Sequence, residues 1–112
     1  MSVIEVAGKA IALNKYGFLE NFEDWDEEVG KILAEGDHLE LAECHWEAIR
    51  FLRDYYREHG FPAPSRVMIK EIGHKLNEFR CTNADLKRLF PKGGCKQACR
   101  IAGLPEYYCN AC

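Results

Sequence analysis

The sequence lacks the features that mark membrane proteins, secreted proteins and the common enzyme classes. No apolar run approaches the roughly 18 residues that a membrane-spanning helix needs. The opening MSVIEVAGK has no basic segment followed by an apolar stretch, so we expect no secretory signal. There is no Gly-rich phosphate loop, no pair of catalytic carboxylates, no Ser/His/Asp arrangement and no internal repeat. These absences predict a single cytoplasmic domain over residues 1–112, without a membrane-embedded segment or a cofactor.

Cysteine, by contrast, is abundant. Six cysteines occur in 112 residues, and four of them lie within the last 18. These four are Cys95, Cys99, Cys109 and Cys112. Because reducing compartments disfavour structural disulfides, clustered cysteines there indicate metal binding, redox chemistry or sulfur chemistry. We therefore expect the chemistry of this chain at its C-terminal end.

The other two cysteines are expected to be structural, and the histidines to be structural or surface residues. Cys44 and Cys81 have no partner at motif spacing, and a buried free cysteine behaves as a small hydrophobe. The histidines are scattered, and none has a cysteine at ligand spacing. They are His38, His45, His59 and His74.

The net charge of −3 conceals an uneven distribution along the chain. Residues 1–65 carry 6 Lys and Arg against 14 Asp and Glu, whereas residues 66–100 carry 9 against 3. The first segment is thus −8 and the second +6. Positive charge beside a cysteine favours the thiolate form, and it also attracts acidic partners.

Apolar spacing predicts an α+β fold. The runs VIEV and AIAL alternate with Gly-containing turns in the first 20 residues, which indicates a small antiparallel β-meander. Such a meander needs helices to pack against. Helical periodicity then predicts about five helices, over residues 25–36, 42–59, 65–77, 82–90 and 95–102. Asp24 is the expected N-cap of the first helix.

The last predicted helix carries two of the clustered cysteines. Cys95 and Cys99 are four residues apart, so both project from the same helix face. Lys96 and Arg100 flank them, and Gly93-Gly94 places Cys95 at the helix N-terminus. Positive charge and a helix N-terminus both lower the pKa of a thiol.

The remaining pair of clustered cysteines lies beyond Pro105. We expect residues 103–112 to form a mobile arm that bears Cys109 and Cys112, since this segment shows no periodicity. Ten residue steps from Cys99 to Cys109 reach up to about 33–36 Å. The arm could therefore extend to a partner or fold back onto Cys99.

Three interpretations of this cluster stay open. Thiol exchange would make it a sulfur or redox relay, in which an arm thiol carries sulfur and Cys99 resolves it. Four thiolates at C-x3-C and C-x2-C spacing would instead bind zinc, with the four clustered cysteines as ligands. The cysteines could also be inert, which fits four cysteines on a polar tail poorly. Separately, the basic helices 66–77 and 82–90 resemble a helix-turn-helix, but no base-reading set is visible, so nucleic acid is not the expected partner.

Four segments resemble the DsrC/TusE family, which includes the small gamma protein associated with dissimilatory sulfite reductase. These segments are HWEAIRFLRDYY (45–56), PSRVMIKEIGHKL (64–76), LFPKG (89–93) and KQACRIAGLP (96–105). The resemblance runs in order from the first predicted strand through Pro105, and so covers nearly the whole chain. It implies a single DsrC-like domain in which a small β-meander packs on an array of helices.

The resemblance also implies a function. Family members accept sulfur as a persulfide on a C-terminal arm cysteine, and in redox-active members a second cysteine, matching Cys99, pairs with it. Such members are co-substrates of sulfite reductase rather than stand-alone enzymes, and members with only the arm cysteine act in sulfur relay towards tRNA thiolation. The implied partners are dissimilatory sulfite reductase or other sulfur-transfer proteins, and a membrane-complex thiol reductase contacted through its soluble side. Basic residues matching Arg66, Lys70 and Arg100 would hold an anionic sulfur chain.

The sequence departs from the family pattern at three places. The tail LPEYYCNAC puts Asn110 where the family's arm cysteine is expected, so that Cys109 falls one residue short and Cys112 two beyond. GGCK replaces GPAK, which adds Cys95 as a further candidate resolver. Ala42 stands where a capping Ser or Thr is common, at a cost of about 1 kcal/mol. A zinc-binding or redox-sensing regulatory protein with a helix-turn-helix-like surface remains the alternative.

Overall fold

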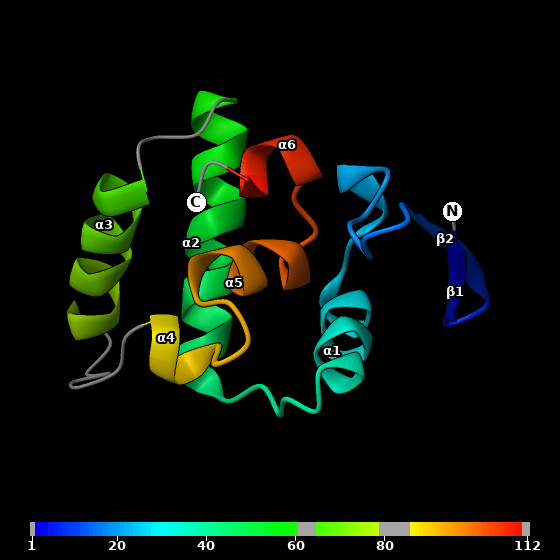
Figure 1. Cartoon of the computed structure of the whole chain (residues 1–112), viewed down its shortest axis with the longest axis horizontal. Coiled ribbons are helices and arrows are strands. Elements are labelled where there is room, and N and C mark those ends of the chain that lie inside the picture. The colour runs from blue at the N-terminus through cyan, green and yellow to red at the C-terminus, as the bar shows by residue number, and fades with distance from the viewer. Residues whose placement is uncertain (1, 61–64, 79–85, 111–112) are drawn as a thin grey trace.

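The computed structural model describes residues 2–60, 65–78 and 86–110, and within these ranges it confirms the expected α+β class (Figure 1). A two-stranded antiparallel sheet is followed by helices. In chain order the elements are β1 (Ser2–Val6), β2 (Lys9–Leu13), the 3-10 turn η1 (Phe22–Asp24), α1 (Glu27–Gly36), α2 (Glu43–His59), α3 (Ser65–Glu78), α4 (Leu86–Leu89), α5 (Cys95–Ile101) and α6 (Glu106–Cys109).

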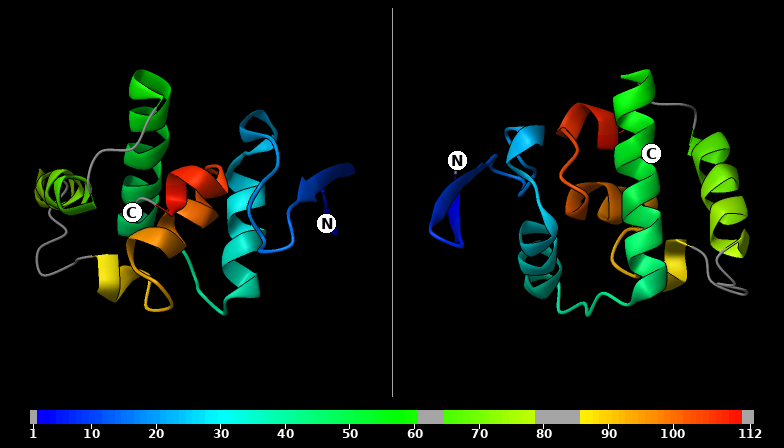
Figure 2. Two further views of the ribbon diagram at one scale, coloured as in Figure 1. Left: turned by 45° about the horizontal axis from the view of Figure 1, so that its top comes forward. Right: turned by 180° about the vertical axis from the view of Figure 1, so that it is seen from behind.

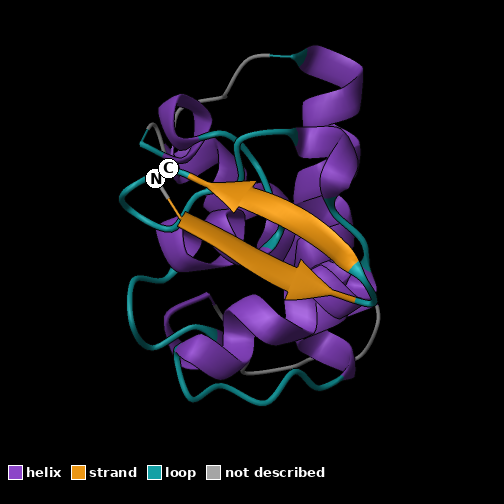
Figure 3. Ribbon diagram, turned by 90° about the vertical axis from the view of Figure 1, so that its right-hand side faces the viewer, coloured by secondary structure: helices purple, strands orange, loops and turns teal. Residues whose placement is uncertain are grey.

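The N-terminal hairpin lies at one end of the molecule (Figure 3). Its register pairs Val6 with Lys9, so a two-residue turn joins the strands. Both turn residues have positive φ, 51° at Ala7 and 84° at Gly8, which is the geometry of the tight turns that match strand twist. An isolated bridge between Leu13 and Leu19 continues the expected meander beyond the two strands.

Helix α1 begins two residues later than the sequence predicts. Asp26, rather than Asp24, is the N-cap, and its carboxylate accepts a hydrogen bond from the Val29 N–H at 3.0 Å. Residues 22–24 form the 3-10 turn instead. Trp25 therefore lies between the two helical segments and belongs to neither.

Helix α2 is the longest element and lies between α3 on one side and α5 with α6 on the other, as the views of Figures 1 and 2 agree. Ala48, Ile49 and Leu52 of α2 are completely buried. The helix ends where the sequence predicts, at Gly60, whose φ of 70° is the left-handed conformation of a helix stop.

His45 replaces the missing N-terminal cap of α2. Its Nδ1 accepts the Ala42 N–H at 3.0 Å, and its Nε2 contacts the Leu89 carbonyl at 2.8 Å. Since Nδ1 accepts, the neutral ring carries its proton on Nε2 and donates to Leu89. The ring also meets Phe90 edge-on at 5.2 Å. The structural role expected for this histidine is confirmed.

The core is centred on α5 and the turn that follows it. Ala98, Ile101, Ala102 and Leu104 are completely buried there, and α5 contacts α1, α2, α4 and α6. The start of the predicted helix 82–90 lies outside the described residues. Within the described ranges, no helix combines the length and apolar character needed to cross a membrane.

Candidate functional site

A disulfide between Cys99 and Cys109 joins α5 to α6. Their Cα atoms are 5.6 Å apart, and both residues are completely buried. The structure thus brings together the helix cysteine and one of the two arm cysteines that the sequence left in contention. Cys109 Sγ also lies 3.7 Å from the Leu104 carbonyl oxygen.

The segment that returns Cys109 to Cys99 is compact. The chain reverses at Gly103, whose φ of 80° favours glycine, and the Leu104 N–H donates to the Cys99 carbonyl at 3.3 Å. Pro105 then caps the single turn of α6, and its carbonyl accepts the Cys109 N–H at 3.1 Å. The part of the expected arm that the structure describes is therefore a docked helical turn, whereas the sequence predicted an irregular segment. Its mobility stays a prediction.

Two side chains from outside the arm hold its root, which we define as residues 101–103, where the chain leaves α5. The Trp25 indole N–H donates to the Ile101 carbonyl at 2.8 Å, and Arg53 Nη1 donates to the Ala102 carbonyl at 2.8 Å. These carbonyls belong to the last turn of α5, where helix carbonyls lack partners within the helix. Residues of the η1–α1 junction and of α2 thus cap the C-terminus of the helix that carries Cys99.

Arg53 is an unusually buried cation, with 5% of its surface exposed. Its guanidinium stacks between two rings, 3.9 Å from the Phe22 centroid and 4.2 Å from the Trp25 centroid. Burial, followed by repulsion from Arg57, lowers the pKa of Arg53 to about 10. The side chain remains a cation at neutral pH, and a cation at a helix C-terminus is stabilising.

Gly103 and Trp25 are in close contact. A Cβ atom built on Gly103 would lie 2.4 Å from Cδ1 of the indole, which is closer than real side chains approach. Only glycine allows this approach together with the positive φ. The root of the arm is consequently packed against the indole face as well as hydrogen-bonded to its edge.

Arg100, which the family resemblance assigned to an anionic sulfur chain, is engaged elsewhere. Its guanidinium pairs with the Asp37 carboxylate, which also accepts the Gln97 side-chain N–H at 3.0 Å. Lys70 is exposed on α3, and the side chain of Arg66 lies outside the described set. The role expected for these three cations stays a prediction.

Positive charge is displayed along the exposed side of α5. An open groove of about 390 Å³ is lined by Lys92 and Lys96 together with Arg100, and Tyr16 is also among its lining residues. Both lysines are exposed. The basic segment inferred from sequence therefore reaches the surface of the helix that carries the disulfide.

The other clustered cysteines are less completely placed. Cys95 is buried at the first position of α5, where the sequence predicts it, and it is not a free thiol. Cys44 is half-buried and its sulfur is also in disulfide form, so the expectation of a free, buried cysteine is wrong at this position. Cys81 and Cys112 lie outside the described residues. Among those described, no three His, Cys, Asp or Glu side chains gather as a metal site.

Tyr108 of α6 is a site residue that the sequence did not indicate. It is 1% exposed and packs edge-on against Tyr56, with the ring centroids 5.0 Å apart. Its hydroxyl has no hydrogen-bond partner within the described chain. Burial raises the pKa of Tyr108 to about 12. The docked arm therefore buries an aromatic ring at the expense of an unsatisfied hydroxyl.

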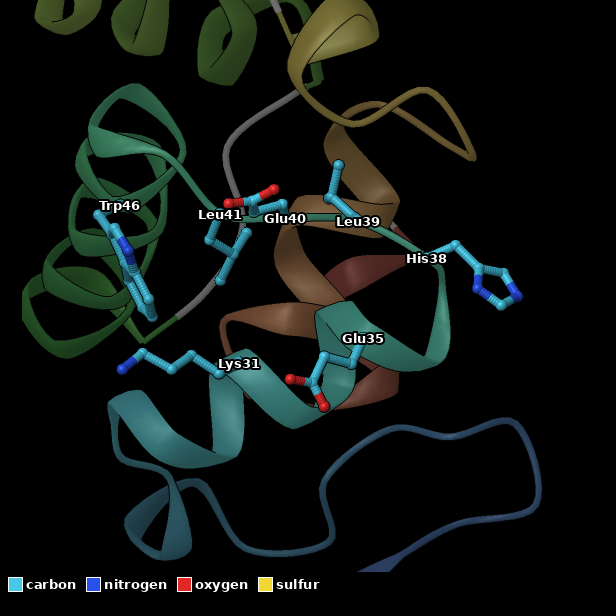
Figure 4. A pocket seen from close by; sticks show the side chains of 7 residues that line it. All are labelled: Lys31, Glu35, His38, Leu39, Glu40, Leu41 and Trp46. Atoms are coloured by element: carbon cyan, nitrogen blue, oxygen red, sulfur yellow. The ribbon is translucent and has the colours of Figure 1, made fainter.

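A second groove, of about 530 Å³, lies between α1, the connection to α2 and the first turn of α2 (Figure 4). Trp46, Lys31 and Glu35 line it, whereas the ring of His38 points away from it in the view of Figure 4. The described lining includes no cysteine. This groove does not belong to the cysteine site.

The sequence indicated the cysteines but not the side chains that hold the arm. Arg53 had a usable signal, because it lies seven residues after Trp46 and so on the same face of the predicted helix 42–59. Trp25 fell within the predicted helix 25–36, which in fact begins after it. Tyr108 lies in a helical turn too short to show periodicity.

Comparisons with known proteins agree with this architecture. The family model described as DsrC like protein matches residues 5–109. The sulfurtransferase TusE of Photorhabdus laumondii is 40% identical over 106 residues, covering 95% of this chain and 96% of the relative. TusE of Escherichia coli K12 is 38% identical over 99 residues, covering 88% and 91%.

Solved structures give the same result. The oxidized gamma-subunit of the dissimilatory sulfite reductase (DsrC) from Archaeoglobus fulgidus matches with a TM-score of 0.77 and 43% identity, covering 93% of this chain and 95% of that one. DsrC of Allochromatium vinosum matches with a TM-score of 0.81 and 46% identity, covering 92% of each. With its α+β fold and its Cys99–Cys109 disulfide, this chain belongs to the DsrC-like family.

Proposed function

We propose that this protein is a cytoplasmic sulfur carrier that accepts sulfur on Cys109 and releases it by exchange with Cys99. Membership of the DsrC-like family and the TusE relatives support a sulfur-relay role in general. The observation that carries the specific assignment is the buried Cys99–Cys109 disulfide, which pairs the helix thiol with one arm thiol. The proposed partner is dissimilatory sulfite reductase or a related sulfur-transfer protein.

The proposed chemistry is thiol exchange. The Cys109 thiolate attacks the outer sulfur of a persulfide or polysulfide donor, the S–S bond of the donor breaks, and the donor leaves as a thiolate while Cys109 becomes the persulfide Cys109–S–SH. The Cys99 thiolate then attacks Cys109 Sγ, the bond to the outer sulfur breaks, and that sulfur leaves as hydrosulfide while the disulfide forms. The outer sulfur gains the two electrons that the two cysteine sulfurs lose. A dithiol reductant, such as the soluble side of a membrane-complex thiol reductase, returns two electrons and two protons to restore the thiols.

The geometry supports a docked product state and an undocked loading state. Both sulfurs are completely buried, so a donor reaches Cys109 only if α6 leaves the core. Helix α6 has four residues, too few to be stable as an isolated helix. Once the disulfide is reduced, α6 would be held by packing and by hydrogen bonds such as that from Asn14 Nδ2 to Glu106 Oε1 at 2.6 Å, and residues 103–112 could serve as the mobile arm.

Positive charge favours the attacking thiolate. Lys96 and Arg100 flank Cys99 on α5, and a nearby cation stabilises a thiolate relative to the thiol. Cys112 is kept as the alternative carrier, and Cys95 as an additional resolver. Zinc binding needs thiolates at all four clustered cysteines, and in this structure Cys95, Cys99 and Cys109 are in disulfide form.

Intact mass spectrometry of polysulfide-treated protein tests the assignment. The reduced wild-type protein should gain increments of 32 Da, the Cys109→Ser variant should lose them, and Cys112→Ser should keep them. Cys99→Ser should accumulate the adduct, because the resolving attack is removed. Cys44→Ser, which removes a cysteine outside the clustered four, is the control and should keep the increments.

Retention of the adduct in Cys109→Ser would overturn the carrier assignment and move it to Cys112. Metal analysis of the reduced protein provides a second check. About one equivalent of zinc, released when Cys95 is replaced, would favour the zinc-binding alternative over sulfur relay.

A further inference from the structure

We propose that Trp25 and Arg53 are positioning residues for the Cys99–Cys109 pair, and that they set how readily its disulfide closes. The inference rests on the proposed function in taking these two thiols as the exchanging pair. It concerns the geometry of exchange, however, and not the source of the sulfur.

The contacts form one continuous support for the arm root. The indole N–H of Trp25 holds the Ile101 carbonyl, and Arg53 holds the Ala102 carbonyl, each at 2.8 Å. The guanidinium is fixed in turn by the Trp25 ring at 4.2 Å and by the Phe22 ring at 3.9 Å. We call Trp25 and Arg53 the clamp.

The clamp acts at the point where the arm leaves the helix. Gly103 follows the clamped carbonyls directly and lies against the indole, and the Leu104 N–H returns to the Cys99 carbonyl at 3.3 Å. The chain is thus fixed from α5 through residue 104. Only residues 105–109 remain to be ordered when Cys109 returns to Cys99.

This arrangement makes ring closure favourable. Cys99 and Cys109 are separated by ten residues, and ordering each additional residue opposes closure through lost conformational entropy. With the clamp in place, half of that segment is ordered before the disulfide forms, so the effective concentration of Cys109 at Cys99 is higher. Without it, the last turn of α5 is freed as well.

The equilibrium that reports this effect is exchange with a reference dithiol. The two protein thiols give two electrons and two protons to oxidised dithiothreitol, which is released as its reduced dithiol while the Cys99–Cys109 bond forms. The ratio of closed to open pairs is measured on the full-length protein at defined dithiothreitol ratios. Differential alkylation followed by peptide mass spectrometry reads the Cys99 and Cys109 peptides separately from the other cysteines.

Two clamp variants and one control make the test specific. Trp25→Phe keeps the ring that packs on Gly103 but removes the N–H donor, and should lower the closure constant by about threefold. Arg53→Gln removes a charged donor and both ring contacts, and should lower it by about tenfold, which corresponds to about 30 mV. Lys31→Gln is the control, because it removes a cation from α1 that pairs with the exposed carboxylate of Glu28.

A purely structural role would give a different result. The clamp variants are therefore also made in a Cys99→Ser/Cys109→Ser background. Any loss of thermal stability that they cause there is independent of the disulfide and does not explain a change in the closure constant. Closure constants of Trp25→Phe and Arg53→Gln within experimental error of the control would overturn the inference. If Arg53→Gln does not fold, Trp25→Phe decides the question.

The test is separable from that of the proposed function. A shifted closure constant without any persulfide on Cys109 would uphold the clamp and refute the carrier. A persulfide on Cys109 with an unshifted closure constant would do the reverse.

Discussion

Replacing Tyr108 with phenylalanine should stabilise the disulfide-bonded protein, although it removes a polar group and adds no contact. The ring is 1% exposed and its hydroxyl has no partner within the described chain. Burying an unpaired hydroxyl costs about 1–3 kcal/mol. Removing it recovers this cost, but the small void that the missing oxygen leaves is destabilising and offsets part of the gain. We expect a gain of about 1 kcal/mol, or about 4 °C in the melting temperature at this chain length.

Urea unfolding of the oxidised protein measures the effect. Tyr16→Phe is the matched control, because Tyr16 is 61% exposed and the same substitution there should change the free energy by less than about 0.5 kcal/mol. A loss of stability in Tyr108→Phe would refute the reasoning, since it would mean that the hydroxyl has a partner in solution.

The same substitution has a signature at high pH. Burial raises the pKa of Tyr108 from about 10 in the unfolded chain to about 12 in the folded protein. Between these values the unfolded chain loses the proton first, so the wild-type protein loses stability as the pH rises. Tyr108→Phe lacks this contribution. Its advantage over the wild type should therefore widen from pH 9 to pH 11.

Two further predictions concern the disulfide and the cap of α2. Closing a loop of ten residues should stabilise the protein by about 2.5–3 kcal/mol, so the Cys99→Ala/Cys109→Ala variant should lose that amount in urea unfolding. A loss below about 1 kcal/mol would show that α6 has already left the core in the folded protein without the disulfide. Burial lowers the pKa of His45, so the unfolded chain binds its proton first, and stability should decline as the pH falls below about 6.5. His45→Gln should flatten this part of the profile between pH 7.5 and pH 5.5, and parallel wild-type and variant profiles would argue against it.

The long helices could be predicted because local signals and packing agree in them. Gly60 ends α2 in the structure as it does in the sequence pattern. At α1, Asp24 was the expected cap and Asp26 is the observed one. Trp25, which lies between them, hydrogen-bonds the Ile101 carbonyl 76 residues away in the sequence. Long-range contacts of that kind leave no periodic trace.

The pairing of the cysteines was open for a related reason. Counting from Cys99 to the family's arm position gave Asn110, one residue beyond Cys109. A residue count cannot settle which arm cysteine reaches Cys99. The chain advances about 1.5 Å per residue as a helix and more than twice that when it is extended. The docked turn puts the Cα atom of Cys109 5.6 Å from that of Cys99, whatever the position in sequence.

The complete burial of both bonded sulfurs also fixes the form of the rate law for reduction. An external thiolate cannot contact either sulfur until α6 opens, so opening precedes attack. At low reductant concentration the rate should rise linearly with the reductant. At high concentration it should reach a plateau equal to the opening rate and become independent of which reductant is used. A physiological reductase that exceeds this plateau must therefore bind the protein and promote opening itself, which makes recognition of the folded surface part of the reduction.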